Sequence, residues 1–101
     1  MKLTNEFKPI RDWAFERGIY EKGDKKTQMI KLVEEMGELS QAILKDDQLE
    51  FEDAIGDCVV VLTNLAELGK VSIEECINSS YDVIAKRKGK MQNGTFVKES
   101  N

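Results

Sequence analysis

The sequence predicts an all-α protein, a four-helix bundle followed by a short extended C-terminal tail. Three observations indicate this fold. Proline occurs once in the 101 residues, at Pro9, so helices are free to form over the rest of the chain. Apolar residues recur at intervals of three and four over long stretches, as they do on one face of a helix. Capping residues and glycines separate these stretches. The length favours one domain spanning 1–101.

The boundaries of the four helices follow from local signals. We expect helices at about 5–17, 24–45, 48–68 and 73–88. Ser72 and Glu75 match a capping box, which marks the start of the last helix. The other signals are candidate N-caps and helix-ending glycines, namely Thr4 or Asn5, Gly18, Asp24 or Thr27, and Gly69. Asn93-Gly94 predicts a turn, and 95–97 is then a short extended arm.

The composition excludes several classes of protein. The chain has no histidine, which rules out Ser-His-Asp and Cys-His catalysis and His-ligated zinc, iron or haem. Cys58 and Cys76 lie 18 residues apart among apolar residues, so we expect buried free thiols in a reducing cytoplasm. The longest stretch without a charge, 58–66, has nine residues, far short of the roughly 20 that span a membrane. We expect neither a membrane segment nor a signal peptide, because residues 1–17 are too highly charged.

Charge is distributed unevenly along the chain. The 19 acidic and 15 basic residues give a net charge of −4, but 27–57 holds nine acids and two bases, whereas 82–101 holds two acids and five bases. The negative net charge and the lack of aromatic residues among the bases argue against nucleic-acid binding. A site that needs both signs of charge would explain the separation.

The third expected helix is apolar all round at 58–62 and 65–66. Such a helix must be covered on every side, and the three other helices of one small chain can hardly do so. A chain of this size also buries only about two thirds of its unfolded surface. We therefore expect a homo-oligomer, a dimer or a tetramer, with this helix near its centre.

Two of the expected helices each present carboxylates on one face. At about 100° per residue, Glu34, Glu35 and Glu38 fall within one arc of the second helix, and Asp53 and Asp57 lie one turn apart on the third. Oxygen ligands without histidine or cysteine favour Mg²⁺ or Mn²⁺. A bound cation would also relieve the repulsion between buried like charges. The alternative is a solvated acidic face without a metal.

Two glycines and an asparagine accompany the carboxylates. Gly37 and Gly56 each precede a candidate ligand, and we expect them to let the two helices approach closely. Asn64 lies on the stripe of Asp57, two turns further along the third helix, and is a candidate substrate ligand.

The basic C-terminal segment has two interpretations. Arg87, Lys88 and Lys90 suit either a solvated C-terminus or the capture of substrate phosphates, with bidentate contacts from Arg87. Lys31 is expected to pair with a glutamate one turn on, and contact with a phosphate is the alternative. Trp13 is either a core or interface residue or a surface on which a nucleobase stacks.

The segments that carry these residues resemble the MazG-like nucleotide pyrophosphohydrolases, and in particular their small single-domain forms. The resemblance rests on KLVEEMGEL at 31–39, DAIGDCVVVL at 53–62 and RKGKM at 87–91, and it extends from Trp13 to about Val97. It implies an all-α nucleoside triphosphate pyrophosphatase fold, assembled as a dimer or a dimer of dimers. It also implies Mg²⁺-dependent hydrolysis between the α- and β-phosphates.

The resemblance further implies roles for individual residues. By that resemblance, metal is ligated by Glu35, Glu38 and Asp57. The residue matching Glu34 orients or deprotonates the attacking water. One position departs from the family pattern, since Ala54 stands where the family usually has a glutamate and the nearby acid is Asp53, one residue earlier. This departure leaves the number of bound metal ions open.

Two functions from different classes remain. The first is Mg²⁺-dependent hydrolysis of a (d)NTP to (d)NMP and pyrophosphate, in the cleaning of nucleotide pools. The alternative is a non-enzymatic helical module for oligomerisation or nucleotide sensing, whose apolar helix binds a partner and whose acids are solvated. Stabilisation by Mg²⁺ separates them, because only a buried carboxylate site gains from binding the ion.

Overall fold

The computed structural model describes residues 5–99, which form five helices and a two-stranded hairpin. In chain order these elements are α1 (Phe7–Glu16), α2 (Ile19–Lys22), α3 (Lys25–Leu44), α4 (Gln48–Leu68), α5 (Ile73–Ile84), β1 (Gly89–Gln92) and β2 (Thr95–Lys98). The predicted all-α class is confirmed, and the strand hairpin stands in the place of the predicted extended tail. None of the helices within 5–99 combines the length and the apolar character that crossing a bilayer needs.

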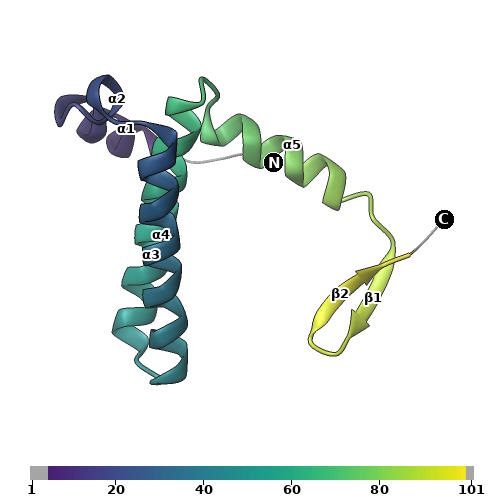
Figure 1. The fold of residues 1–101 in the computed structure, drawn as a ribbon. Coiled ribbons are helices and arrows are strands. Elements are labelled where there is room, and N and C mark those ends of the chain that lie inside the picture. The colour runs from purple at the N-terminus through teal and green to yellow at the C-terminus, as the bar shows by residue number, and fades with distance from the viewer. Residues whose placement is uncertain (1–4, 100–101) are drawn as a thin grey trace.

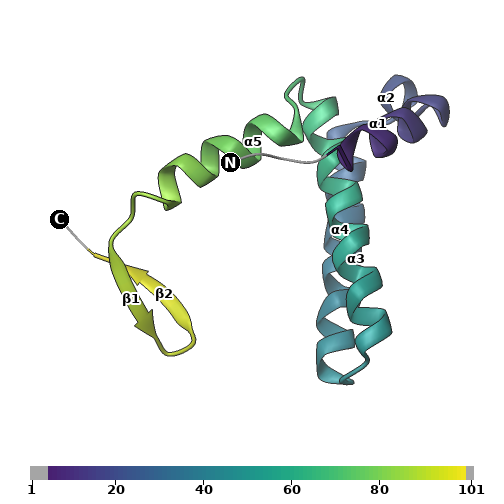
Figure 2. The ribbon, with the colours of Figure 1, turned by 180° about the vertical axis from the view of Figure 1, so that it is seen from behind.

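The two longest helices, α3 and α4, run antiparallel and side by side (Figures 1 and 2). Each begins at an aspartate whose side chain accepts a hydrogen bond from the backbone N–H three residues on, Asp24 from Thr27 and Asp47 from Glu50. Asp46 closes the turn between them with a φ of 56°. α3 starts after Asp24, one of the two predicted caps, and the bounds of α4 are as predicted. These local caps decide where both helices begin.

Small apolar side chains bring α3 and α4 together. The buried apolar residues of the two helices are Leu32, Ala42, Ala54 and Val61. The prediction that Gly37 and Gly56 permit the close approach was wrong, since a Cβ added at either glycine would meet no atom within 4 Å. The alanines fill that role, because their positions face the neighbouring helix and those of the glycines do not.

The N-terminal helices lie at the end of the α3–α4 pair where α3 begins (Figure 1). Gly18 ends α1 as predicted and has a φ of 78°, a backbone conformation that glycine adopts without strain. The short α2 forms between the first and the second predicted helix, where no helix was expected. The N-cap of α1 is Glu6, without a side-chain hydrogen bond, so Asn5 as a cap was wrong. The other predicted cap, Thr4, lies outside the described residues.

The start of α5 is fixed by its own cap and by α1. Ser72 Oγ accepts a hydrogen bond from the Glu75 backbone N–H at 3.1 Å, the predicted capping contact. The Arg11 guanidinium of α1 donates two hydrogen bonds of 2.6 Å to the Glu74 carboxylate. Between α4 and α5, Gly69 is the C-cap with a φ of −84°, and Lys70 after it takes the left-handed conformation with a φ of 63°. The glycine was expected in that left-handed position.

The strand hairpin follows α5, which ends at Ile84 instead of near 88. Asn93 and Gly94 form the predicted turn, with φ values of 51° and 83°, as a two-residue hairpin turn requires. A Cβ added at Gly89 would collide with the Val97 carbonyl oxygen and lie 2.7 Å from the Phe96 ring. Gly89 therefore belongs to the sheet, and the helix must end before it.

The single chain is open rather than compact. α5 diverges from the end of α4, and the hairpin stands apart from α3 and α4 in both views (Figures 1 and 2). The radius of gyration is 16.1 Å, compared with about 13 Å for a compact chain of about 100 residues. The accessible surface is 8023 Å², compared with about 5,800 Å² for a compact monomer of this mass.

Candidate metal centre

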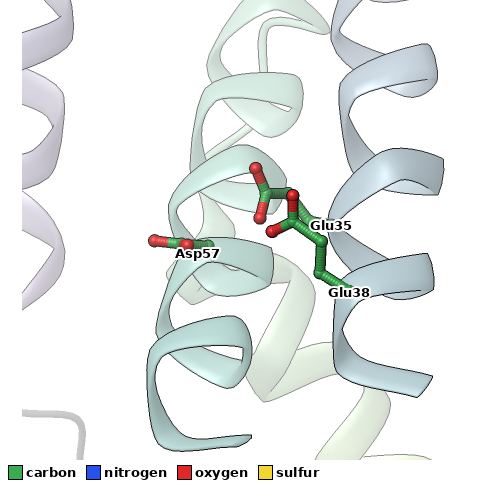
Figure 3. Close-up of side chains that lie close together, drawn as sticks. All are labelled: Glu35, Glu38 and Asp57. Atoms are coloured by element: carbon green, nitrogen blue, oxygen red, sulfur yellow. The ribbon is translucent and has the colours of Figure 1, made fainter. Parts of the chain in front are cut away.

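A cluster of three carboxylates joins α3 to α4. Glu35 and Glu38 come from α3 and Asp57 from α4, and one oxygen from each lies within 4.8 Å of the others. Figure 3 shows the three side chains on these two neighbouring helices. Glu35 and Asp57 are each eleven residues from Asp46 in the turn, and an antiparallel pair sets such residues side by side. We call Glu35, Glu38 and Asp57 the carboxylate cluster.

Glu35 occupies a core position of α3. The intervals from Leu32 to Glu35 and from Glu35 to Ala42 are three and seven residues, the spacing of one helix face, and Glu35 is 8% exposed. Its Oε1 lies 3.5 Å from Lys31 Nζ, the ion pair that the spacing predicted. Its Oε2 is buried and has no hydrogen-bond partner among the described residues.

An unpaired buried carboxylate oxygen needs a compensating charge. Burying a charge without a partner costs several kcal/mol, and the exposed Lys31 ammonium reaches only the other oxygen, Oε1. Glu38 is exposed and Asp57 is half-buried, so the cluster is reachable from solvent on one side. A cation held by three carboxylates would satisfy the free oxygen. The residues therefore fit a hard divalent ion such as Mg²⁺ or Mn²⁺.

The negative charges act on one another in the protein without metal. Burial, and after it the charges of Asp53 and Glu35, raise the pKa of the Asp57 carboxyl above its ordinary value. Burial, and after it the charges of Glu35 and Asp57, raise the pKa of the neighbouring Cys58 thiol. The site is thus a region of negative potential, and a divalent cation would relieve it.

Two other predicted carboxylates lie beside the cluster and not in it. Glu34 is exposed on α3, one residue before Glu35. Asp53 is exposed on α4 and shares a cavity of about 310 Å³ with Glu38, Lys45 and Glu50. Asp53 acts on the cluster through its charge, which raises the pKa of Asp57.

The predicted substrate ligands are dispersed in the single chain. Arg87 and Lys88 follow α5 and Lys90 lies on β1, all exposed and on the far side of α5 from the cluster. Asn64 is 3% exposed, and its Oδ1 accepts a hydrogen bond of 2.7 Å from the Tyr20 hydroxyl. That contact ties α2 to α4. Tyr20 was not among the predicted site residues, because nothing local marks a partner 44 residues away.

Trp13 lines an apolar cavity close to the cluster. Trp13 is 45% exposed and forms, with Pro9, Ile10 and Val60, a cavity of about 310 Å³. The Arg17 guanidinium lies 5.5 Å from the centre of the indole ring. Val60 is three residues after Asp57 on α4, so the cavity is less than one helical turn along the axis from the cluster.

The fold and the cluster define a class, helical proteins with a carboxylate centre between two antiparallel helices. Within that class the chain belongs to the MazG nucleotide pyrophosphohydrolase domain family, whose model matches residues 24–92. The matched region runs from the cap of α3 through β1 and includes the whole carboxylate cluster.

The chain is also similar to an individual protein over part of its length. The chain is 40% identical over 65 residues to an uncharacterized 18.2 kDa protein from the rep-hol intergenic region of Haemophilus phage HP1 (strain HP1c1). The match covers 64% of this chain and 40% of the phage protein. No solved structure matches the chain.

Proposed function

We propose that this chain is a Mg²⁺-dependent nucleoside triphosphate pyrophosphohydrolase that cleaves a (d)NTP between its α- and β-phosphates. The products are the (d)NMP and pyrophosphate. The observation that carries the proposal is the carboxylate cluster, in which a buried oxygen of Glu35 has no partner. The chain's membership of the MazG nucleotide pyrophosphohydrolase domain family supports the reaction class.

The cluster would hold the metal through Glu35, Glu38 and Asp57, with Mn²⁺ as an alternative ion. A bound divalent ion neutralises phosphate charge and lowers the pKa of a coordinated water. The exposed Asp53 stands beside this set, one turn from Asp57. Its position leaves room for a second ion near Glu38, in the cavity that the two residues line.

The other residues of the chain complete the chemistry. Glu34 precedes the cluster on α3 and is exposed, so it is free to orient and deprotonate the attacking water. Arg87, Lys88 and Lys90 supply the positive charge that the outer phosphates require. Trp13 offers an apolar cavity near Asp57 for the nucleobase. Lys31 stays with Glu35 and sets the orientation of that ligand.

The assembly is part of the proposal. We expect a homo-oligomer, a dimer or a tetramer, because large apolar side chains of α3 and α4 stay open to solvent in the single chain. They include Met29, Ile30, Val33, Met36, Ile55, Val59 and Leu62. Covering them would place α4 at the centre of the oligomer. Cys58 is half-buried and Cys76 is exposed, so the expectation that both thiols are buried was wrong. Both are free, which suits a reducing cytoplasm, where removal of surplus or non-standard nucleotides is the expected role.

The test is to incubate the purified protein with a panel of (d)NTPs in Mg²⁺ and in Mn²⁺ and to identify the products. We expect monophosphate and pyrophosphate. Glu38→Gln should abolish turnover with the oligomer intact, whereas Glu52→Gln, an exposed carboxylate of α4 outside the cluster, should leave turnover unchanged. Release of orthophosphate, no turnover of any nucleotide, or a fully active Glu38→Gln protein would refute the proposal.

A further inference from the structure

We propose that the C-terminal arm of one chain lies on the α3–α4 pair of a second copy and brings its basic residues to that copy's carboxylate cluster. The arm comprises residues 85–99, the segment after α5 together with β1 and β2. The role given to the basic residues of the arm rests on the proposed function. Its contacts can be tested independently of that function.

The arm cannot reach the cluster of its own chain in the observed fold. The cluster lies on α3 and α4, whereas α5 leads away from the end of α4 and carries the arm beyond it (Figures 1 and 2). The two hydrogen bonds from Arg11 to Glu74 fix the first turn of α5 to α1. These bonds hold α5 in its outward direction, so in the observed fold the arm is left for a partner from outside the chain.

The arm has an exposed apolar face that needs a covering surface. Every residue of β1 and β2 is exposed, and the two strands pair only with each other in the described part of the chain. Met91 and Phe96 are cross-strand partners and so share a face of the hairpin. They are 67% and 48% exposed. An isolated two-stranded hairpin is at best marginally stable in water, so this face needs a surface to pack against.

The positive charge of the arm indicates the surface against which it packs. The arm holds five bases and one acid, whereas 27–57, which covers most of α3, the turn after it and the first half of α4, holds nine acids and two bases. Opposite potentials steer two surfaces together and fix how they meet. The acidic surface that this chain presents is on α3 and α4, and a second copy offers the same surface at the same concentration.

The surface left open in the single chain matches what a dimer buries. Its accessible area of 8023 Å² exceeds that of a compact monomer by about 2,200 Å². A standard interface takes about 800 Å² from each partner, so an arm contact and a helix–helix contact both fit within the excess. A twofold axis makes the exchange reciprocal, because each copy then gives one arm and receives one.

The experiment uses a carbodiimide, which joins a lysine amine directly to a carboxylate that it touches. Two chains are co-expressed with different affinity tags, and the mixed complex is isolated through both tags. The first chain carries Glu34→Gln and Glu38→Gln, two exposed positions, and a native arm. The second has native α3, and its arm lysines are replaced with the charge kept: Lys86→Arg, Lys88→Arg, Lys90→Arg and Lys98→Arg.

Linkages between an arm lysine and Glu34 or Glu38 are then mapped by mass spectrometry. In the mixed complex only a contact between chains can form one, from the first chain's arm to the second chain's glutamates. We expect arm-to-α3 linkages in the native protein and half that yield in the mixed complex, with both yields falling as salt is raised.

Three outcomes would overturn the inference. They are linkages in the native protein but none in the mixed complex, no such linkages in the native protein, and failure to recover any mixed complex because the chain is a monomer. None of these readouts requires nucleotide turnover. A chain that links but cleaves nothing would refute the proposed function alone, and one that cleaves without linking would refute the arm contact alone.

Discussion

Asp57→Asn should raise the stability of the metal-free protein and remove its stabilisation by Mg²⁺. The cluster oxygens lie within 4.8 Å of one another. Two unit charges at that separation repel by about 1 kcal/mol in water and about 3 kcal/mol at an effective dielectric constant of 20. The raised pKa of Asp57 agrees with this repulsion, because it means that the folded protein disfavours the ionised form of the Asp57 carboxyl. Because the cluster is open to solvent on one side, we expect a gain of about 1 kcal/mol.

Mg²⁺ should remove the difference in stability between the Asp57→Asn protein and wild type, or reverse it. A free Mg²⁺ concentration ten times the dissociation constant stabilises the native protein by about 1.4 kcal/mol. In a domain of this size each kcal/mol shifts Tm by about 4–8 °C. Without Mg²⁺ the Asp57→Asn protein should therefore melt several degrees above wild type, and with saturating Mg²⁺ it should melt no higher than wild type.

The assay is thermal unfolding with and without Mg²⁺, at one protein concentration and at constant ionic strength. Glu52→Gln is the matched control, because it removes an exposed carboxylate of the same helix from outside the cluster. It should keep the full Mg²⁺ shift of wild type. A metal-free Asp57→Asn protein less stable than wild type would show that repulsion at Asp57 does not destabilise the fold. An undiminished Mg²⁺ shift in that protein would show that Asp57 does not bind the ion.

Two further predictions concern the contacts that position the helices. Arg11 lowers the pKa of Glu74 below its ordinary value of 4.5, so the clamp stabilises the fold above that pH and is lost as the pH falls through the lowered pKa. Glu74→Gln should thus lower the free energy of unfolding in urea by about 1 kcal/mol at pH 7 and by progressively less below pH 4.5. A difference that does not depend on pH would exclude the ion pair as the cause. Tyr20→Phe leaves the buried Asn64 Oδ1 without its donor and should lower stability by about 1–2 kcal/mol; an unchanged urea midpoint would show that the contact contributes nothing.

The helix boundaries could be predicted because short-range signals decide them. Asp24 and Ser72 cap α3 and α5 through bonds to backbone groups three residues away, which the sequence displays directly. The end of α5 could not be predicted in the same way. It depends on how Gly89 packs beneath Phe96 across the hairpin, a contact that no helical period reveals.

That carboxylates would form the site could be predicted from the sequence, but which of them make up the cluster could be predicted only in part. Helical spacing places Glu35 and Glu38 on one face, but only the antiparallel pairing about Asp46 brings Asp57 beside them. The same pairing leaves Asp53 one turn away from the cluster. The clamp between Arg11 and Glu74 joins residues 63 apart, and long-range side-chain pairs of this kind leave no local signal.

Glu35, Glu38 and Asp57 should together hold a divalent ion. Crystals grown with Mn²⁺ test this most directly, because the anomalous scattering of manganese locates the ion independently of any assay of activity. We expect an anomalous peak bonded to oxygens of all three side chains, one of them the Oε2 of Glu35, which has no other partner among the described residues. A map in which saturating Mn²⁺ leaves that position without a peak, while Lys31 stays paired with Glu35, would contradict this expectation.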